Sequence, residues 1–282
     1  MDKVYKYCSA HGLNILRDLE LKVTPPNQFN DPFEFAPKMF CSDPVLYASR
    51  NLEREPVLKV FYEMCRSDGQ FLGSFHEFRE LAKKEMPKWT RILAEAPQHT
   101  LPLLEKEFLD EVSKRFGILC LSQNRNSILM WGHYCNKTRG LVIGFDKSSE
   151  IFRQGKGLRP VDYIKERVNL DACWEGGSLE MANYESQIIS SKSDDWSYEH
   201  EFRQIFALSS SSLTKKPLKD NDQNLGYFLS IPPEAIVSVT LGPRCSPELE
   251  NEVREVLQKP CFSNVKLDRA VLHKNDFVIE IE

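Results

Sequence analysis

The sequence lacks the motifs that most simply reveal a function. Its eight cysteines are scattered, with no Cys-x-x-Cys or paired Cys/His spacing, which argues against a zinc site and a disulfide framework. We therefore interpret them as buried or incidental thiols. Neither a Walker phosphate loop nor a Gly-x-Gly-x-x-Gly fingerprint occurs, and no Gly-x-Ser-x-Gly elbow supports a serine hydrolase.

Long apolar runs and a charge excess are also missing. No stretch approaches the roughly 18 apolar residues that cross a bilayer, and no apolar segment of the kind found in secretory signals follows Met1. The net charge of −4 and pI of about 6.0 give no overall basic field for nucleic acid. With 282 residues and 41% hydrophobic content, we expect a single cytoplasmic domain over residues 1–282 with no membrane partner.

The first half of the chain alternates between sheet and helix patterns. Alternating apolar residues predict strands at residues 4–8 and 20–24, and leucines at helical spacing predict a short helix at 11–19. From about 44 to 115 the chain is charged and helix-rich. An apolar stripe there indicates a helical insertion: Phe75, Phe78, Leu81, Ala82, Met86 and Trp89.

Short strands dominate the second half. Ser246 followed by Pro247 predicts the start of a helix that ends at Leu257, and another short helix is expected at 128–135. The polar stretch 209–224 indicates a flexible loop or hairpin tip. Strands are expected at 117–122, 139–146, 157–164, 201–208, 227–231, 236–241, 265–272 and 276–281. The predicted fold class is α+β, with a mixed, mostly antiparallel sheet.

The segment 196–203 carries the most informative pattern, a Glu-x-Glu pair. On a strand, Glu199 and Glu201 would point to the same side, with Arg203 one pleat further on. Two like charges facing one way suit a cleft, where they perturb each other or bind a polar ligand. The alternative is a solvated edge strand with a self-paired face.

Three further clusters of chemistry-bearing residues stand out, at 5–7, at 30–34, and at 122–124 together with 130–134. His133 is a candidate acid–base residue or a structural histidine, and Asp31 either caps a turn, the interpretation that its Asn-Asp-Pro context favours, or holds a ribose. If strand ends meet at one edge of the sheet, these clusters converge. The candidate ligand contacts are Lys6, Tyr7, Asn30, Asp31, Ser122, Trp131 and Tyr134.

The order of these motifs resembles a widespread bacterial domain-of-unknown-function family over about residues 3–245. The resemblance rests on the motifs at residues 5–7, 30–34, 120–122, 130–134, 139–146 and 196–203. This resemblance implies no settled activity.

A second resemblance is to the ADP-ribosyltransferase fold. That fold opens with a strand bearing an NAD-contacting residue, here Lys6 or Tyr7, and its central strand often ends in serine, here Ser122. One subclass uses Glu-x-Glu, here Glu199 and Glu201. The chain departs from the pattern, because the first strand has no His or Arg at that place and a Ser-Thr-Ser triplet is absent.

The second resemblance implies an NAD-dependent ADP-ribosyltransferase or NAD glycohydrolase, with NAD as substrate and an unknown protein or nucleic acid as acceptor. It also implies a toxin or phage-defence setting. Glu201 would stabilise an oxocarbenium-like ribose and Glu199 would activate the acceptor. Trp131 or Tyr134 would stack on a ring, and Lys6 or Arg203 would bind the pyrophosphate.

Two alternatives remain open. Asp194, Asp195, Glu199 and Glu201 could collect Mg²⁺ in a nuclease, although the preferred interpretation needs no metal site. The other alternative is a non-enzymatic module that binds a nucleotide or a partner at the Trp-x-His-Tyr segment.

Overall fold

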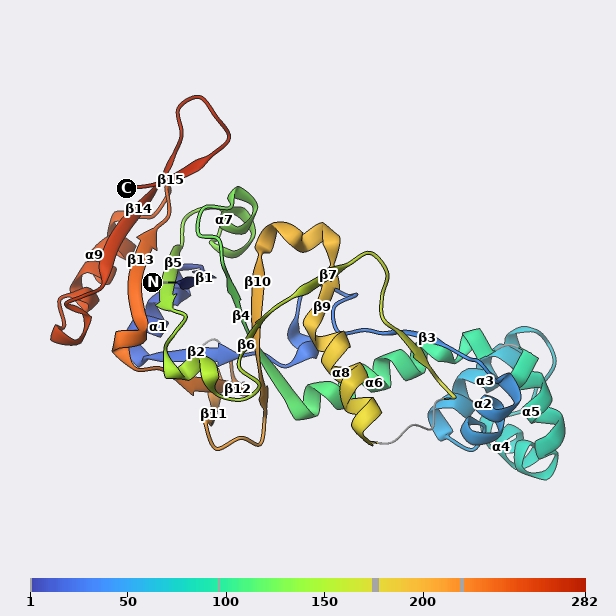
Figure 1. Ribbon diagram of the computed structural model, residues 1–282. Coiled ribbons are helices and arrows are strands. Elements are labelled where there is room, and N and C mark those ends of the chain that lie inside the picture. The colour runs from blue at the N-terminus through green and yellow to red at the C-terminus, as the bar shows by residue number, and fades with distance from the viewer. Residues whose placement is uncertain (1, 96, 174–177, 219–220) are drawn as a thin grey trace. The chain divides into compact units, whose positions relative to one another are not determined.

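The computed structural model describes residues 2–95, 97–173, 178–218 and 221–282 (Figure 1). The chain forms two compact units. The first unit comprises Met1–Asn30, Ser113–Ile164 and Ser190–Glu282, and the second comprises Asp31–Val112 and Lys165–Ile189. The helical insertion expected at about 44–115 therefore belongs mainly to the second unit, which also takes in a segment from later in the chain.

The elements of the first unit are mostly short strands. They are β1 (Lys3–Cys8), α1 (Leu13–Asp18), β2 (Glu20–Val23), β4 (Phe116–Ser122), α7 (Ile128–Tyr134), β5 (Leu141–Asp146), β6 (Leu158–Pro160), β7 (Asp162–Ile164), β9 (Ser191–Ser193), β10 (Glu201–Ala207), β11 (Leu213–Leu218), β12 (Asn221–Ser230), β13 (Ile236–Leu241), α9 (Pro247–Leu257), β14 (Lys266–Leu272) and β15 (Ile279–Ile281).

The largest sheet within the described ranges has eight strands in the order β15-β14-β13-β5-β1-β4-β10-β6. Its neighbours are antiparallel except for β13 and β14, so the expected mixed, mostly antiparallel α+β class is confirmed. A second sheet, β11-β12-β2, and the parallel pair β7–β9 complete the first unit. No helix in the described parts of the chain has the length and apolar composition needed to cross a membrane.

Two expectations about strands were wrong in detail. The strand expected at 157–164 divides into β6 and β7, which join different sheets because β6 pairs with β10 while β7 pairs with β9. Of the loop or hairpin tip expected at 209–224, the loop was wrong: the stretch contributes β11 and the start of β12, which pair antiparallel, and the ladder hydrogen bonds hold β11 in spite of its charges. Residues 219 and 220 of that stretch lie outside the described chain.

The core of the first unit lies between the large sheet and its helices. Leu141, Ile143 and Phe145 of β5 are fully buried, and Val253 of α9 belongs to the same apolar cluster. Ser246 caps α9 by accepting a hydrogen bond from the backbone N–H of Leu249, as its sequence predicts.

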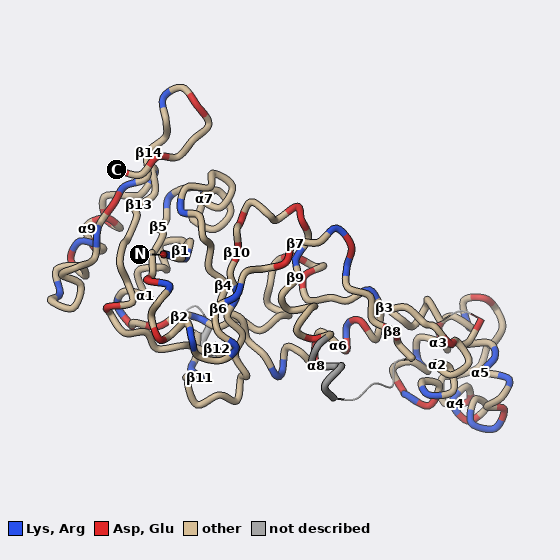
Figure 2. Tube along the Cα trace, in the orientation of Figure 1, with Lys and Arg blue, Asp and Glu red and all other residues tan. Residues whose placement is uncertain are grey.

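The second unit is mainly helical. Its elements are β3 (Lys38–Phe40), α2 (Pro44–Asn51), α3 (Glu55–Ser67), α4 (Phe75–Lys84), α5 (Met86–Glu95), α6 (Leu101–Arg115), β8 (Asn169–Asp171) and α8 (Ser178–Ser190). The predicted apolar stripe forms its core, where Phe78 packs edge-on against Phe61 and Trp89. Acidic and basic residues are interspersed along α4 and α5 (Figure 2), so these helices carry no block of one sign.

Candidate functional site

The Glu-x-Glu pair lies at a junction between two elements and not on one strand, so that expectation was wrong. Glu199 ends the 3₁₀ helix Asp194–Glu199, and Glu201 begins β10. His200 between them has a left-handed backbone, with φ of 43°, which ends the helix and turns the chain into the strand. The two carboxylates nevertheless meet, because both reach the same lysine.

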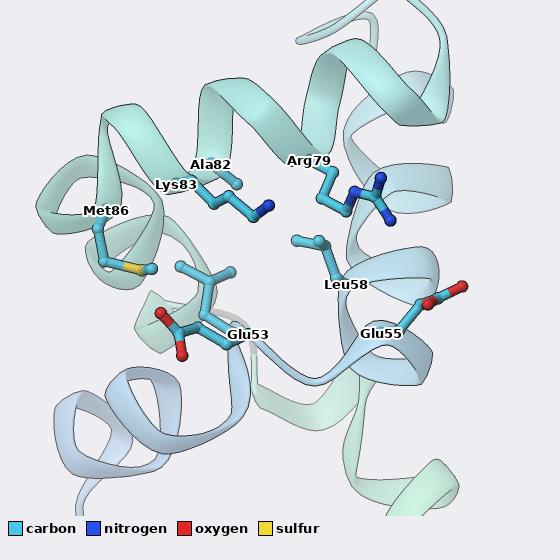
Figure 3. A pocket seen from close by; sticks show the side chains of 8 residues that line it. Glu53, Glu55, Leu58, Arg79, Ala82, Lys83 and Met86 are labelled. Carbon is cyan, nitrogen blue, oxygen red and sulfur yellow. The ribbon is translucent and has the colours of Figure 1, made fainter.

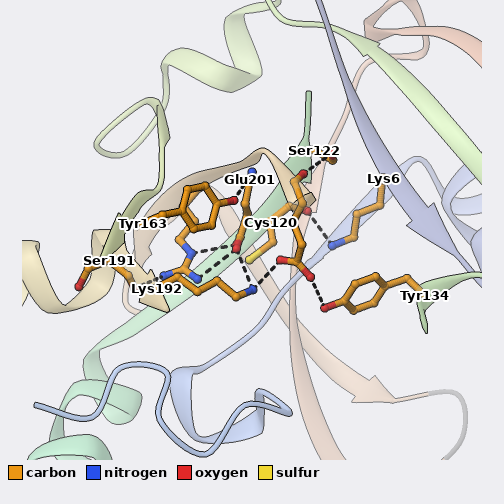
Figure 4. Close-up of polar contacts among 10 residues, drawn as sticks. Lys6, Cys120, Ser122, Tyr134, Tyr163, Ser191, Lys192 and Glu201 are labelled. Atoms are coloured by element: carbon orange, nitrogen blue, oxygen red, sulfur yellow. Dashed lines mark hydrogen bonds and ion pairs between the residues drawn. The ribbon is translucent and has the colours of Figure 1, made fainter. Parts of the chain in front are cut away.

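Lys192 lies between the two carboxylates, and Figure 4 shows it beside Glu201. Its Nζ is 2.6 Å from Oε2 of Glu199 and 3.1 Å from Oε2 of Glu201. The three side chains are at most 5% exposed. The ammonium also lies 4.9 Å from the centre of the Trp196 ring, within reach of a cation–π interaction. The like charges predicted from the sequence are thus neutralised by a buried cation.

Arg203 completes the cluster from the same strand as Glu201. Its Nε and Nη2 donate to Oε1 and Oε2 of Glu201 at 2.9 and 3.2 Å, a bidentate pair, and its Nη1 donates to the Ser191 carbonyl. Burial opposes the charge of Glu201, but Arg203 and Lys192, with a hydrogen bond from Cys120, outweigh it and lower the pKa of Glu201 to about 2. Glu201 is therefore an ionised, firmly held carboxylate.

Three hydroxyl groups fix the positions of the two glutamates. Tyr134 donates to Oε1 of Glu199 at 2.6 Å. Ser122, at the end of β4, donates to the Glu199 carbonyl at 2.6 Å, and the Tyr163 hydroxyl accepts the Glu201 backbone N–H at 2.8 Å. Burial and the neighbouring Glu199 carboxylate raise the pKa of Tyr134, so its phenol stays protonated and acts as a donor.

A cleft of about 390 Å³ opens beside this cluster, within the first unit. Tyr134 lines it and so connects it to Glu199. Lys6, Lys22 and Lys216 also line the cleft. The acidic residues Asp18 and Glu20 in the same lining offset part of this positive charge. The Lys6 ammonium of β1 donates to the Cys120 carbonyl of the neighbouring strand β4 at 2.9 Å. The remaining lining includes Cys8, Ser9, His11, Asn14, Ile15 and Phe228.

Aromatic rings form a rim on the other side of Tyr134. The exposed His133 lies 6.5 Å from the ring centres of both Trp196 and Tyr198, and those two rings are 6.0 Å apart. This spacing is that of ordinary aromatic packing. His133, predicted as a catalytic residue, thus lies at the rim and has its ring 6.3 Å from that of Tyr134.

Several predicted ligand contacts are buried structural groups. Trp131 is 0% exposed, and its Nε1 donates to the Arg125 carbonyl, so its ring offers no free face. Tyr7 packs edge-on against Trp131 and donates to the Asn124 carbonyl, while one edge of it reaches the cleft. Ser122 is also buried.

The segment 30–34 spans the boundary between the two units. Asn30 is exposed at the end of the first unit, and Asp31 begins the second. Asp31 Oδ1 accepts the backbone N–H of Phe33 at 2.9 Å, which is the turn geometry favoured by the sequence. The other three clusters of candidate residues converge in the first unit.

A second hollow of about 380 Å³ lies in the second unit (Figure 3). Its apolar lining includes Leu58, Ala82 and Met86, and Glu53 and Lys83 are among the charged residues around it. Its lining charges are of both signs and do not assemble into a buried acid–base pair. The first unit therefore carries the stronger candidate site.

The carboxylates do not gather as metal ligands. Within the described residues, no group of three or more His, Cys, Asp or Glu side chains is arranged to hold a metal ion. Asp195 bonds instead to the Ser193 hydroxyl, and Lys192 fills the space between Glu199 and Glu201.

Sequence reasoning missed the residues that neutralise and orient the carboxylates. Lys192 stands seven positions before Glu199 in a serine-rich stretch, outside the segment 196–203 that carries the Glu-x-Glu pattern. A lone lysine between polar residues carries no pattern of its own. Tyr163, Lys22 and Lys216 were also missed, since their role depends on long-range strand pairing.

Residues 130–204 match the model of a family described as "Protein of unknown function (DUF2971)". Over these residues, the match confirms the resemblance to a domain-of-unknown-function family. The matched segment runs from α7 to β10 and includes Tyr134, Lys192, Glu199, Glu201 and Arg203. No curated protein and no solved structure matches the chain.

Proposed function

We propose that the first unit binds NAD in the cleft beside Tyr134 and cleaves its nicotinamide–ribose bond, as an ADP-ribosyltransferase or NAD glycohydrolase. One observation carries the proposal. Tyr134 both lines the cleft and donates to Glu199, so a carboxylate lies one side chain behind the cleft wall.

The lining of the cleft suits a phosphorylated ligand with ribose rings. Lys6 and Lys22 offer ammonium groups to a pyrophosphate. Asp18 can accept hydrogen bonds from ribose hydroxyls, and Phe228 contributes a ring for a base. The volume of about 390 Å³ falls in the lower part of the range for small-molecule sites, about 300–1,000 Å³.

The proposed chemistry uses Glu199 as the working carboxylate. As nicotinamide leaves with the bonding electrons, the ribose C1′ becomes oxocarbenium-like, and a nearby negative charge stabilises it. A water or acceptor nucleophile then bonds to C1′ and loses its proton to Glu199 or solvent. With water, NAD and water give nicotinamide, ADP-ribose and a proton.

We assign the two glutamates the reverse of the roles first expected, and their contacts support this assignment. Glu201 is held by both nitrogens of Arg203 and by Lys192, which suits a positioning role. Glu199 is held by Lys192 and by Tyr134, and Tyr134 borders the cleft. Rotation of one phenol would expose the Glu199 carboxylate to a ligand.

A second candidate is a nucleotide-binding module without turnover. The burial of both glutamates and their complete pairing with Lys192 and Arg203 favour it, because such a cluster also serves as a structural ion-pair network. Both candidates share the cleft and differ in turnover.

The deciding experiment follows free nicotinamide from NAD with the full-length protein and with Glu199→Gln. Glu255→Gln is the matched control, since Glu255 is an exposed glutamate of α9. If the protein is an enzyme, the wild type and the control should release nicotinamide, and Glu199→Gln should not. Release unchanged by Glu199→Gln would contradict the assignment. A rise in melting temperature with NAD but no nicotinamide would support the binding module, and neither effect would reject NAD as the ligand.

A further inference from the structure

Two cysteines of the second unit are in contact although 132 positions separate them in the sequence. The Sγ atoms of Cys41 and Cys173 lie 3.4 Å apart. Cys41 directly follows β3 and Cys173 lies just beyond β8, and these two strands pair in parallel. The thiols thus meet where two paired strands end.

Hydrogen bonds on both sides of the thiols hold the two segments together. The Asp171 carboxylate accepts the backbone N–H groups of Ser42 and Cys173, at 3.2 and 2.9 Å. The Cys173 thiol contacts the Asp43 carbonyl at 3.0 Å. The strand pairing and these bonds therefore keep the two cysteine-bearing segments next to each other.

We propose that Cys41 and Cys173 are an oxidation site that forms an intramolecular disulfide bond. A disulfide has an S–S distance of about 2.05 Å, so the sulfurs must approach by roughly 1.4 Å. Side-chain rotation supplies such a movement while the strand pairing stays in place. The other described cysteine pairs show no comparable contact between sulfurs.

A peroxide is the oxidant in this proposal. One thiolate attacks a peroxide oxygen and becomes a sulfenic acid as the other oxygen leaves as water. The second thiol then attacks the sulfenic sulfur, forms the S–S bond and releases a second water. Two thiols and one hydrogen peroxide give one disulfide and two waters.

The surroundings make this reaction slow at neutral pH. Burial and the adjacent Cys173 thiol raise the pKa of Cys41 to about 12, so little reactive thiolate is present. The rate of disulfide formation therefore increases with pH. The site responds to sustained oxidation and not to a brief pulse.

The test exposes the reduced full-length protein to hydrogen peroxide at pH 7 and pH 9. Remaining thiols are then blocked with N-ethylmaleimide, and the peptides are identified by mass spectrometry. We expect a linked peptide pair containing Cys41 and Cys173, two hydrogens lighter than the free peptides and released by dithiothreitol. It should form faster at pH 9, and cross-linking should raise the melting temperature by several degrees.

Two variants make the test specific. Cys41→Ser should abolish the linked pair, and Cys261→Ser, which removes an exposed thiol, should leave it unchanged. The proposal is overturned if Cys41 and Cys173 both remain open to the blocking reagent at pH 9. Linkage of either cysteine to a different partner, or oxidation of Cys41 beyond the sulfenic acid without a link, would overturn it equally.

Discussion

The Lys192 ammonium lies 2.6 Å from the Glu199 carboxylate, with both side chains almost completely buried. Lys192 reaches Glu201 as well, so one cation holds two anions that come from different elements of the fold. A buried charge without a partner is costly. The cluster therefore acts as one unit, because removing any member leaves buried charges with fewer partners and so destabilises the fold.

Replacing Lys192 with methionine should destabilise the first unit by about 3–5 kcal/mol, because it leaves the buried Glu199 carboxylate without its cation and removes one of the two cations that hold Glu201. Lys192→Arg keeps the charge and should lose less. Lys216→Met is the matched control. Its partner Glu20 and its own side chain are partly exposed, so the expected loss is below about 1 kcal/mol. Urea unfolding measures all three, and equal losses for Lys192→Met and Lys216→Met would contradict the buried-pair account.

Acid should destabilise the protein through Glu201. Its folded-state pKa of about 2 lies below its ordinary value of 4.5, so between these values the unfolded chain binds more protons. Stability from this group is present above about pH 5 and is lost as the pH falls toward 2, a change on the order of 3 kcal/mol. Unfolding free energies from pH 6 to pH 3 should fall more steeply for the wild type than for Glu201→Gln. A parallel pH dependence in the two proteins would show that Glu201 is not the linked group.

Tyr134→Phe removes the hydroxyl that donates to Glu199 and keeps the aromatic ring, so it isolates the contribution of the hydrogen bond. The change leaves Oε1 of Glu199 without its phenol donor and should cost about 1–3 kcal/mol of stability. Tyr198→Phe is a suitable control at the rim, where the contacts of Tyr198 are ring contacts. Thermal and urea unfolding of both variants give the comparison. A larger loss in Tyr198→Phe would mean that the Tyr134–Glu199 bond contributes little.

Lys22→Ala should weaken binding of an anionic ligand in the cleft. Loss of one charge-assisted hydrogen bond, about 1.5–3 kcal/mol, corresponds to a roughly 10- to 150-fold rise in Kd. Lys274→Ala, an exposed lysine that does not line the cleft, should leave Kd unchanged. Calorimetric titration with NAD supplies both values. An unaltered Kd for Lys22→Ala would remove Lys22 from the binding site.

The fold could be predicted from the sequence where local pattern and final environment agree. Alternating apolar residues located β1 and β2, and the Ser246 cap located the start of α9. Prediction failed where tertiary pairing decides. The charged strand β11 is held by its ladder with β12, and α8 was not foreseen.

The candidate site divides in the same way. Glu199, Glu201 and Arg203 were found because an acidic pair beside a cation is visible within one short segment. Lys192 and Tyr163 reach the cluster through the parallel pair β7–β9, a long-range contact that leaves no local signal. The geometry of Glu199 was missed for a local reason, the left-handed His200, since residues other than glycine adopt that backbone in only a few per cent of cases.

Two glycines near the site should respond oppositely to alanine. At Gly132, an exposed position of α7, an added Cβ would meet no atom within 4 Å. Gly132→Ala should therefore stabilise the helix by about 0.5–1 kcal/mol. At Gly140, just before β5, the Cβ would lie 2.0 Å from the Cys8 carbonyl oxygen, which is backbone and cannot rotate away. Gly140→Ala should therefore force β1 and the β5 turn apart, at a cost above about 2 kcal/mol. Urea midpoints of the two variants should move in opposite directions. A Gly140→Ala midpoint equal to that of the wild type would mean that β1 does not approach this turn as closely as described.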